Sequence, residues 1–557
     1  MNNHDLLKGI SLNSIVKASF LGLGTDIITL IVINCLPFLC TILFPYTRLS
    51  EKLDYLIFAL CNLPFILISL IDVEYFRFTG QPLSISVLNI KTDIRQQTIS
   101  LVTYYWYISL ILLLISVVFI IFIPRQASFT RYFLHKITLI LLLIFGSQSI
   151  SDLSVSSGIK ENNIYKYMLS NATLSLIRSS RTTEVKKISL LTDAEVAKYI
   201  RRDSSRHHFF HQKKQNVFII ICESLSSECL FKGKTPFLDS LSQQGLSMKS
   251  FYANGRESID AIPAILASVP KLSDNHFIQY VSHKTYPKTI GSFLKASGYK
   301  TMFFHGARDG SMGFKTFTRK AGYDEYFGMD TYPDKSKHFD GAWGIFDEYF
   351  LSYACQTVSK VHAPFHSVLF TLSSHNPYKL PSHFPLKKGE KNEMHTSMRY
   401  ADYSLKKFFR EAEKTDWYQN TLFIITGDHT HLQTAEGKEA YQVPLIIFHP
   451  DKYESAQIKR KGNSLKIAQH IDILPSVLDF LNIEEKKALP FGESLFSVNE
   501  GMAFSYHSGV YHLFSPSEDV SFTLNRSEAK NQTFASIKLK AMLQYYHNTF
   551  MQSYHNH

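Results

Sequence analysis

The first third of the chain alternates apolar stretches with polar segments. Each stretch approaches the ~20 residues that a helix needs to cross a bilayer. Buried core helices are the alternative, but four such stretches in close succession favour a membrane anchor of four helices over residues 1–150. A weakly marked segment near residues 9–25 would make it five. The four stretches are residues 27–44, 55–71, 104–123 and 133–150.

Basic residues in the short loops predict the orientation of this anchor. Arg48 and Lys52 lie between the first two stretches, and Arg125 and Arg131 lie between the last two. Because short cytoplasmic loops are enriched in Lys and Arg, we expect everything after residue 150 to lie outside the cytoplasm. The longer second loop is also basic and would lie outside, which weakens the inference.

Residues 151–215 form a polar, basic segment that contains RSSRTT and RRDSSRHHFFHQKKQ. One interpretation is a solvated linker. The other is a stalk that lies along anionic headgroups, and the two are compatible.

After residue 215 short apolar runs alternate with helix-like stretches. Continuous apolar runs of this length are typical of strands buried on both faces. Helix-like segments such as PFLDSLSQQG, TIGSFLKASG and MRYADYSLKKFFREAEK lie between them. The alternation predicts an α/β fold, doubly wound around a mostly parallel sheet, over residues 216–500, with 501–557 as its C-terminal part. The predicted strands lie in NVFIIICES, YKTMFFHG, HSVLFTLSSH, NTLFIITGDH and VPLIIFHP.

Composition narrows the class of partner. The formal net charge is +12, from 59 Lys+Arg against 47 Asp+Glu, and 45% of the residues are hydrophobic. The basic residues are spread out and form no recognisable nucleic-acid module, so a lipid bilayer with anionic headgroups is the better partner and no nucleic acid is expected. The six cysteines form no CxxC motif, and we expect free thiols.

Acids and imidazoles follow four of the predicted strands. In parallel sheets the active site lies beyond the carboxyl ends of the strands, so these side chains should share one edge. Each has a structural alternative: Glu223 as a helix cap, His305 as a core histidine, the Asp-His pair as a polar turn. Together they suit Mn²⁺, Zn²⁺ or Mg²⁺. The strand-end residues are Glu223, His305, Ser373, Ser374, His375, Asp428 and His429.

Ser258 is the candidate nucleophile. It follows Gly255 in NGRES and opens the helix-like run SIDAIPAILAS. A hydroxyl at a helix N-terminus faces unpaired backbone N–H groups and the positive end of the helix dipole. Taken alone, Ser258 is more easily interpreted as a helix cap.

These motifs, in this order, resemble the alkaline phosphatase/sulfatase superfamily, and within it the lipoteichoic acid synthase-like enzymes. The resemblance covers about residues 216–500 and includes TPFLDSL, NGRESIDAIPAILASVP, GYKTMFFHGARDGSMGF, DGAWGIFDEYF, TLSSHNPY, IITGDHT and HIDILPSVLDFL. It implies that Glu223, Asp428 and His429 bind one divalent metal, most simply Mn²⁺. The implied nucleophile and further metal ligand is Ser258, and His375 contacts the substrate phosphate. Weaker candidates for the substrate pocket are His305, Arg308 and Trp343.

The resemblance also implies a function, and this sequence departs from the family's motifs at two places. A bacterial inner-membrane, multi-pass transferase is expected, which moves a phosphoglycerol or phosphoethanolamine headgroup from a phospholipid donor to a glycan or glycolipid acceptor through Ser258. Met312 and Phe314 stand where gram-positive members have a Trp and an Arg that bind glycerol phosphate, which leaves the headgroup open. SIDAI lacks the Pro and Arg of a sulfatase motif. A sulfatase-like phosphodiesterase or sulfuric ester hydrolase with water as acceptor is the alternative, and a non-catalytic envelope scaffold is a second.

Overall fold

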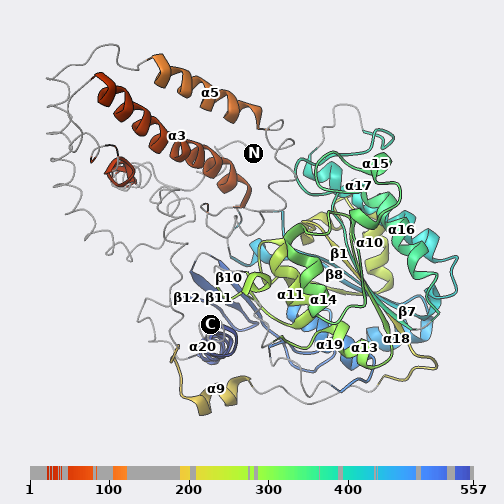
Figure 1. Cartoon of the computed structure of the whole chain (residues 1–557). Helices are drawn as coiled ribbons and strands as arrows, with labels where there is room; N and C mark the ends of the chain where they lie inside the picture. The colour runs from red at the N-terminus through yellow and green to blue at the C-terminus, as the bar shows by residue number, and fades with distance from the viewer. Residues whose placement is uncertain are drawn as a thin grey trace. The chain divides into compact units, whose positions relative to one another are not determined.

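The computed structural model comprises two compact units whose boundary lies near residue 183 (Figure 1). The expected fourth membrane stretch, residues 133–150, and residues 151–187 of the expected linker lie outside the described residues. The structure describes scattered residues between 22 and 39, then 48–79, 83, 105–121, 188–200 and 209–551, without 274–275, 281–285, 363, 387–392, 432–434, 436, 485–490, 508 and 524–532.

Two long helices dominate the described part of the first unit. Helix α3 (Arg48–Thr79) contains the second apolar stretch, and α5 (Trp106–Ile121) contains most of the third. Among the described residues, the one helix long and apolar enough to cross a membrane is Leu56–Tyr75, with a mean hydropathy of 2.3. The expected total of four or five membrane helices therefore stays a prediction.

A seven-stranded sheet forms the centre of the second unit, in the order β2-β8-β7-β1-β6-β4-β5. The five strands from β7 to β5 are parallel, and β8 runs antiparallel to both of its neighbours. The predicted fold class, α/β with a mostly parallel sheet, is confirmed. The strands are β1 (Asn216–Cys222), β2 (Leu246–Met248), β4 (Lys300–His305), β5 (Glu325–Phe327), β6 (Phe365–Phe370), β7 (Thr421–Gly427) and β8 (Leu445–Phe448).

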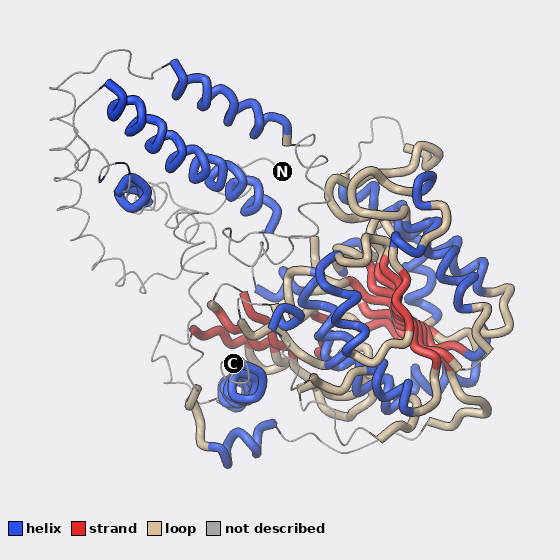
Figure 2. Tube along the Cα trace, in the orientation of Figure 1, coloured by secondary structure: helices blue, strands red, loops and turns tan. Residues whose placement is uncertain are grey.

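Both faces of this sheet are covered, as the pattern of continuous apolar strands predicts (Figure 2). Val217, Ile219 and Ile221 of β1 pack into one core, while Phe218 and Ile220 pack into the other. Each such side chain contributes about 1.5–3 kcal/mol when buried. The first core is completed by α11 (Ser258–Ala267), α13 (Ile290–Ala296), α14 (Phe314–Lys320), α19 (Ile473–Phe480) and α20 (Phe534–Tyr546), and the second by α10 (Pro236–Gln244), α16 (Asp347–Val358) and α17 (Met394–Ala412).

Smaller elements complete the second unit. An antiparallel sheet joins β10 (Ala503–His507), β11 (Val510–Phe514) and β12 (Asp519–Thr523), and β3 (Ser250–Tyr252) pairs with β9 (Ile467–Gln469). Three further helices are α12 (Phe277–Tyr280), α15 (Lys335–His338) and α18 (Lys452–Lys461). The 3₁₀ turns are η2 (Ser227–Cys229), η3 (Ser311–Gly313), η4 (Met329–Thr331), η5 (Tyr418–Asn420), η6 (Gly437–Tyr441) and η7 (His470–Asp472), and η8 (His547–Met551) is a π-helical turn.

Part of the expected linker packs against the folded unit. Helix α9 (Asp193–Ile200) buries Val196 and Ile200 against Ala541 of α20. The side-chain oxygen of Gln544 accepts hydrogen bonds from the backbone N–H groups of Leu190 and Leu191, at 2.7 and 2.9 Å. Residues 188–200 are therefore part of the folded unit.

The cysteines of the described residues are free thiols, as expected. Cys222, Cys229 and Cys355 are buried, and Cys35 and Cys61 lie in the first unit.

Candidate active site

The carboxyl ends of β1 and β7 approach each other closely, which brings Glu223 and Asp428 together. A Cβ atom on Gly427 would lie 2.1 Å from the carbonyl oxygen of Leu225, so only glycine allows this approach. The N–H of Asp428 donates to the carbonyl of Cys222 at 3.2 Å. Two residues far apart in sequence thus project carboxylates from adjacent strand ends.

Ser224 aligns the two carboxylates. Its backbone is left-handed, with φ 57°, a conformation that costs an ordinary residue roughly 1–2 kcal/mol. In this conformation its N–H donates to Oδ1 of Asp428 at 2.7 Å, and its hydroxyl donates to Oε1 of Glu223 at 2.7 Å. These two hydrogen bonds hold both acids in one arrangement, and the left-handed backbone of Ser224 is the strained conformation that allows them.

Glu223, Asp428 and His429 form a buried group of potential metal ligands, with ligand atoms within 4.8 Å of one another. His429 Nε2 lies 3.6 Å from Glu223 Oε1 and 3.4 Å from Asp428 Oδ2. His429 Nδ1 lies 2.9 Å from the carbonyl of Thr430, which only accepts, so Nδ1 carries a proton and Nε2 is the ring nitrogen that faces the two carboxylates and can bind a metal.

The charges of this group fit a divalent cation. Asp428 Oδ2 is buried and has no hydrogen-bond partner among the residues that the structure describes. Burial, together with the charge of Glu223, raises the pKa of Asp428 to about 7. Two adjacent buried carboxylates are costly without a positive partner, and together with the imidazole they suit Mn²⁺, Zn²⁺ or Mg²⁺.

Ser258 lies in contact with the same group. Its hydroxyl is 3.2 Å from Oε2 of Glu223 and 3.4 Å from Nε2 of His429. Ser258 is the first residue of α11, and the N-cap is Glu257, whose side chain makes no capping bond. The interpretation of Ser258 as a helix cap is therefore wrong.

A charged cluster that sequence reasoning missed supports the turn before Ser258. Lys271 Nζ donates to Asp260 Oδ2 at 2.9 Å, and His276 Nδ1 lies 2.8 Å from Asp260 Oδ1. A Cβ atom on Gly255 would lie 2.5 Å from the Asp260 Cβ, so the NGRES turn packs directly on this carboxylate. Asp260 is the one ionisable residue in SIDAIPAILA, and a buried charge in an apolar helix predicts a partner.

His375 and Trp343 lie together at the end of β6. Their ring centroids are 4.2 Å apart, and the Trp343 indole N–H donates to the Asn376 carbonyl at 2.6 Å. His375 Nδ1 lies 2.8 Å from the same carbonyl, so Nε2 carries the lone pair. Burial lowers the pKa of His375 to about 4. The imidazole is therefore neutral near pH 7.

Asp347 holds the segment that carries His375, and sequence reasoning missed it. Its Oδ1 accepts hydrogen bonds from the backbone N–H groups of Leu372 and Ser373, at 2.8 and 3.2 Å. The Asp347 N–H donates to the Ser373 hydroxyl at 3.0 Å, and the Ser374 hydroxyl donates to the Glu223 carbonyl at 2.8 Å. These serines therefore connect the segments of the site.

Two of the weaker candidates, His305 and Arg308, are not among the residues that contact Ser258 or form the metal-ligand group. His305 is 1% exposed and packs between Phe370 and Phe314, with ring centroids 5.1 and 5.2 Å away. Its pKa falls to about 3, mainly through burial. Arg308 is exposed to solvent. Phe314 is fully buried in the core, which explains structurally why this position carries no charge here.

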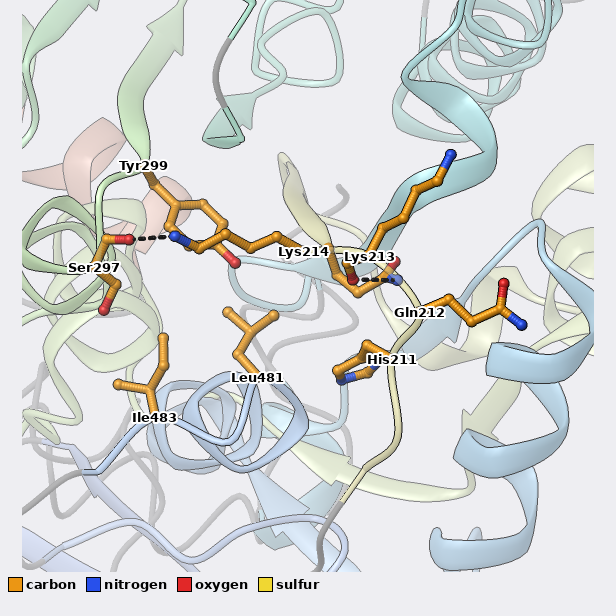
Figure 3. Close-up of a pocket in the computed structure, with 9 residues that line it drawn as sticks. His211, Gln212, Lys213, Lys214, Ser297, Tyr299, Leu481 and Ile483 are labelled. Atoms are coloured by element: carbon orange, nitrogen blue, oxygen red, sulfur yellow. Dashed lines mark hydrogen bonds between the residues drawn. The ribbon is translucent and has the colours of Figure 1, made fainter.

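A separate cavity of about 310 Å³ lies at the opposite edge of the sheet (Figure 3). It is bordered by Gln215 and Tyr299, which directly precede β1 and β4, and by Leu481. Lys214 Nζ donates to the Ser297 carbonyl at 2.6 Å there. No predicted site residue lines this cavity. Glu223, Asp428 and His429 lie instead at the carboxyl edge of the sheet, where parallel sheets place their sites.

The second unit is similar in sequence to a known protein family and to several curated proteins. Residues 215–483 match the family model described as Sulfatase. The lipoteichoic acid synthase-like protein YvgJ of Bacillus subtilis (strain 168) is 24% identical over 375 residues, which is 61% of this chain and 58% of the relative. Lipoteichoic acid synthase 1 of the same organism is 25% identical over 336 residues, 55% of this chain and 51% of the relative. The chain thus spans about half the length of the curated relatives it matches.

Solved structures show the same fold. A protein in the alkaline phosphatase superfamily from Vibrio parahaemolyticus matches with a TM-score of 0.55 and 22% identity, over 65% of this chain and 97% of that one. The lipoteichoic acid synthase LtaP from Listeria monocytogenes matches with a TM-score of 0.53 and 17% identity, over 65% of this chain and 99% of that one.

Proposed function

We propose, since residues 215–483 form a sulfatase-family domain with relatives named lipoteichoic acid synthases, that this protein transfers a phosphoglycerol or phosphoethanolamine headgroup. The donor is a membrane phospholipid, and the acceptor is an envelope glycan or glycolipid. The observation that carries this proposal is the position of the Ser258 hydroxyl between Glu223 and His429, at the first residue of α11.

Ser258 acts as the nucleophile. As its oxygen bonds to phosphorus, the bond from phosphorus to the diacylglycerol oxygen breaks, and that oxygen takes up the proton that the Ser258 hydroxyl gives up. In the second step the acceptor oxygen bonds to the same phosphorus, the bond from phosphorus to the Ser258 oxygen breaks, and the proton of the acceptor hydroxyl returns to Ser258. Backbone N–H groups at the start of α11 face the phosphate oxygens in both steps.

Glu223, Asp428 and His429 hold the divalent cation, for which we favour Mn²⁺ over Zn²⁺ or Mg²⁺. When bound, such an ion lowers the pKa of a coordinated hydroxyl and neutralises phosphate charge. The buried Asp428 Oδ2, which has no hydrogen-bond partner among the described residues, and the position of His429 Nε2 facing both carboxylates support this assignment.

His375 exchanges protons with the leaving and entering oxygens. Its neutral ring, with the lone pair on Nε2, takes the proton of the Ser258 hydroxyl and passes it to the diacylglycerol oxygen in the first step, and it takes the proton of the acceptor hydroxyl and passes it to the Ser258 oxygen in the second. Trp343 orients this ring through their tilted ring contact and the shared Asn376 carbonyl.

The first unit anchors the enzyme in a bacterial inner membrane, with the catalytic unit outside the cytoplasm. The apolar helix Leu56–Tyr75 supports this placement. An anchor keeps the site beside lipid headgroups and raises their effective concentration.

The test is a product assay on the full-length protein in vesicles that contain headgroup-labelled phosphatidylglycerol or phosphatidylethanolamine. Label in a glycan or glycolipid acceptor supports transfer. Release of only free glycerol phosphate or ethanolamine phosphate, with acceptor present, contradicts transfer and makes the protein a phosphodiesterase. Absence of any release with either donor contradicts both.

A further inference from the structure

A second group of potential metal ligands lies beside the candidate active site. Glu228, Cys229 and His431 place one ligand atom each within 4.8 Å of the others. Glu228 Oε1 lies 2.9 Å from His431 Nε2 and 3.9 Å from His395 Nε2. Two ligands of one zinc ion are separated by roughly 3.5 Å, given bond lengths of 2.0–2.3 Å in a tetrahedron. Glu228, Cys229 and His431 are therefore close enough to share one ion, and the ring of His395, with its centroid 5.5 Å from that of His431, lies beside them.

We propose that Glu228, Cys229, His395 and His431 form a second divalent-cation site that is selective for Zn²⁺. A thiolate and two imidazoles select zinc over manganese and magnesium, which prefer oxygen ligands. The group that contacts Ser258 contains two carboxylates and one imidazole and no sulfur, so the two sites differ in their metal preference.

The surroundings of His431 are those of a metal-binding histidine. Its Nδ1 lies 2.7 Å from the Ser226 hydroxyl, and the same hydroxyl accepts the His431 N–H at 3.0 Å. A hydrogen bond to one ring nitrogen orients the other nitrogen toward a metal. Here that other nitrogen, Nε2, faces Glu228.

Lys234 occupies the position of the cation in this structure. Its ammonium lies 2.7 Å from His395 Nε2 and 3.8 Å from Glu228 Oε1, between two of the four ligands. A positive charge is therefore already favoured at this point. Lys234 lies in the turn before α10 and its side chain is 23% exposed, so it can move into solvent when a zinc ion enters.

The site would join three segments that surround the catalytic group. Glu228 and Cys229 lie in η2, five and six residues after Glu223, and His395 lies in the first turn of α17. His431 follows His429 by two residues, so their Cα atoms are at most ~7 Å apart. Zinc binding therefore fixes the segments that carry Glu223 and His429.

Cobalt absorption tests the proposal on the full-length protein in detergent. Burial raises the pKa of Cys229 to about 11, so its sulfur is a protonated thiol until a metal removes the proton. Saturating Co²⁺ should produce a near-ultraviolet thiolate-to-cobalt band, which the sulfur-free catalytic group does not produce. The band should compete away with Zn²⁺ and should persist in Ser258→Ala, which separates this result from the proposed function.

Substitutions in this cluster should change the affinity for Co²⁺ in opposite directions. Cys229→Ser should abolish the band, and His431→Gln should weaken Co²⁺ binding at least tenfold. Lys234→Met should strengthen it several-fold because the competing ammonium is gone, an effect that misfolding does not mimic. Absence of the band in the wild-type protein, its persistence in Cys229→Ser, or equal or weaker binding in Lys234→Met would overturn the proposal.

Discussion

The Ser258 hydroxyl lies 3.4 Å from Nε2 of His429, although 171 residues separate them in sequence. One residue begins α11 and the other follows β7. This contact places a hydroxyl directly against a buried carboxylate–imidazole group. It requires Gly427 and the left-handed Ser224, which bring the strand ends together.

Ser258→Ala should separate folding from activity. The hydroxyl does not cap α11, so its loss should change the free energy of unfolding by less than the ~1 kcal/mol of a lost cap. Loss of a covalent nucleophile should lower headgroup transfer by several orders of magnitude. Melting temperature and labelled transfer are measured on one preparation. Ser242→Ala, a buried serine in α10, is the control and should keep full activity, whereas near-normal transfer by Ser258→Ala would refute its role.

Glu223→Gln should not lower the melting temperature without metal, but it should make the protein less stable than the wild type when metal is present. Without metal, the charge of Glu223 disfavours ionisation of Asp428, so its removal should leave the melting temperature unchanged or higher. With Mn²⁺ at 100 times its dissociation constant, the wild-type protein should gain about 2.7 kcal/mol and the variant much less.

Asp402→Asn is the matched control for that experiment. Asp402 is a buried carboxylate that accepts the N–H groups of Phe237 and Leu238, at 3.0 and 2.9 Å, away from the metal group. Its change should cost about 1 kcal/mol and preserve the gain with Mn²⁺. An equal gain in Glu223→Gln and the wild-type protein would show that Glu223 is not a ligand.

His375 and Trp343 should affect turnover without affecting metal content. His375→Ala should lower transfer about 10²–10⁴-fold through loss of proton exchange. Trp343→Phe keeps a ring beside His375 but removes the donor to Asn376, so it should cost about tenfold through misorientation. Trp417→Phe, which removes a donor to Ser359, is the control and should be near normal. A Trp343→Phe rate equal to that of Trp417→Phe would contradict the orienting role.

Asp347 should make the stability of the folded unit depend on pH. Burial raises its pKa to about 7, above its ordinary value of 3.8. The folded state therefore keeps a proton that the unfolded state loses, so the free energy of unfolding falls as pH rises from about 4 to 7, by at most ~1.4 kcal/mol per pH unit. Asp347→Asn retains an oxygen acceptor and should flatten this slope. Melting temperatures at pH 5, 6, 7 and 8 test this, and identical slopes would contradict it.

The sequence predicts the sheet well, and it predicts that Glu223, Asp428 and His429 lie together at one edge, because both depend on local patterns. Continuous apolar runs such as NVFIIIC identify strands buried on both faces, and the acids that follow them must share an edge. The sequence alone leaves the role of Ser258 open, because a helix cap and a nucleophile both occupy the start of a helix. Which role Ser258 has depends on where Glu223 and His429 lie in space.

Other residues depend on long-range contacts that no local pattern encodes. Asp347 acts on a segment 25 residues later, and Asp260 meets Lys271 and His276 only after the chain folds back. His305 shows the converse, since it follows a strand as His375 does, yet packs among aromatic rings. Position at a strand end predicts the edge, and the neighbours that a side chain meets in the folded chain then decide whether it joins the site.

If Ser258 is the nucleophile, its oxygen carries the headgroup between donor and acceptor. Mass spectrometry of the full-length protein, incubated with phosphatidylglycerol or phosphatidylethanolamine in the absence of acceptor, detects this covalent state. We expect a phosphoglycerol or phosphoethanolamine adduct on the peptide that contains Ser258, its disappearance when acceptor is added, and its absence in Ser258→Ala. Headgroup release without any adduct, or an adduct on another residue such as Ser373 or Ser374, would show that Ser258 is not the nucleophile.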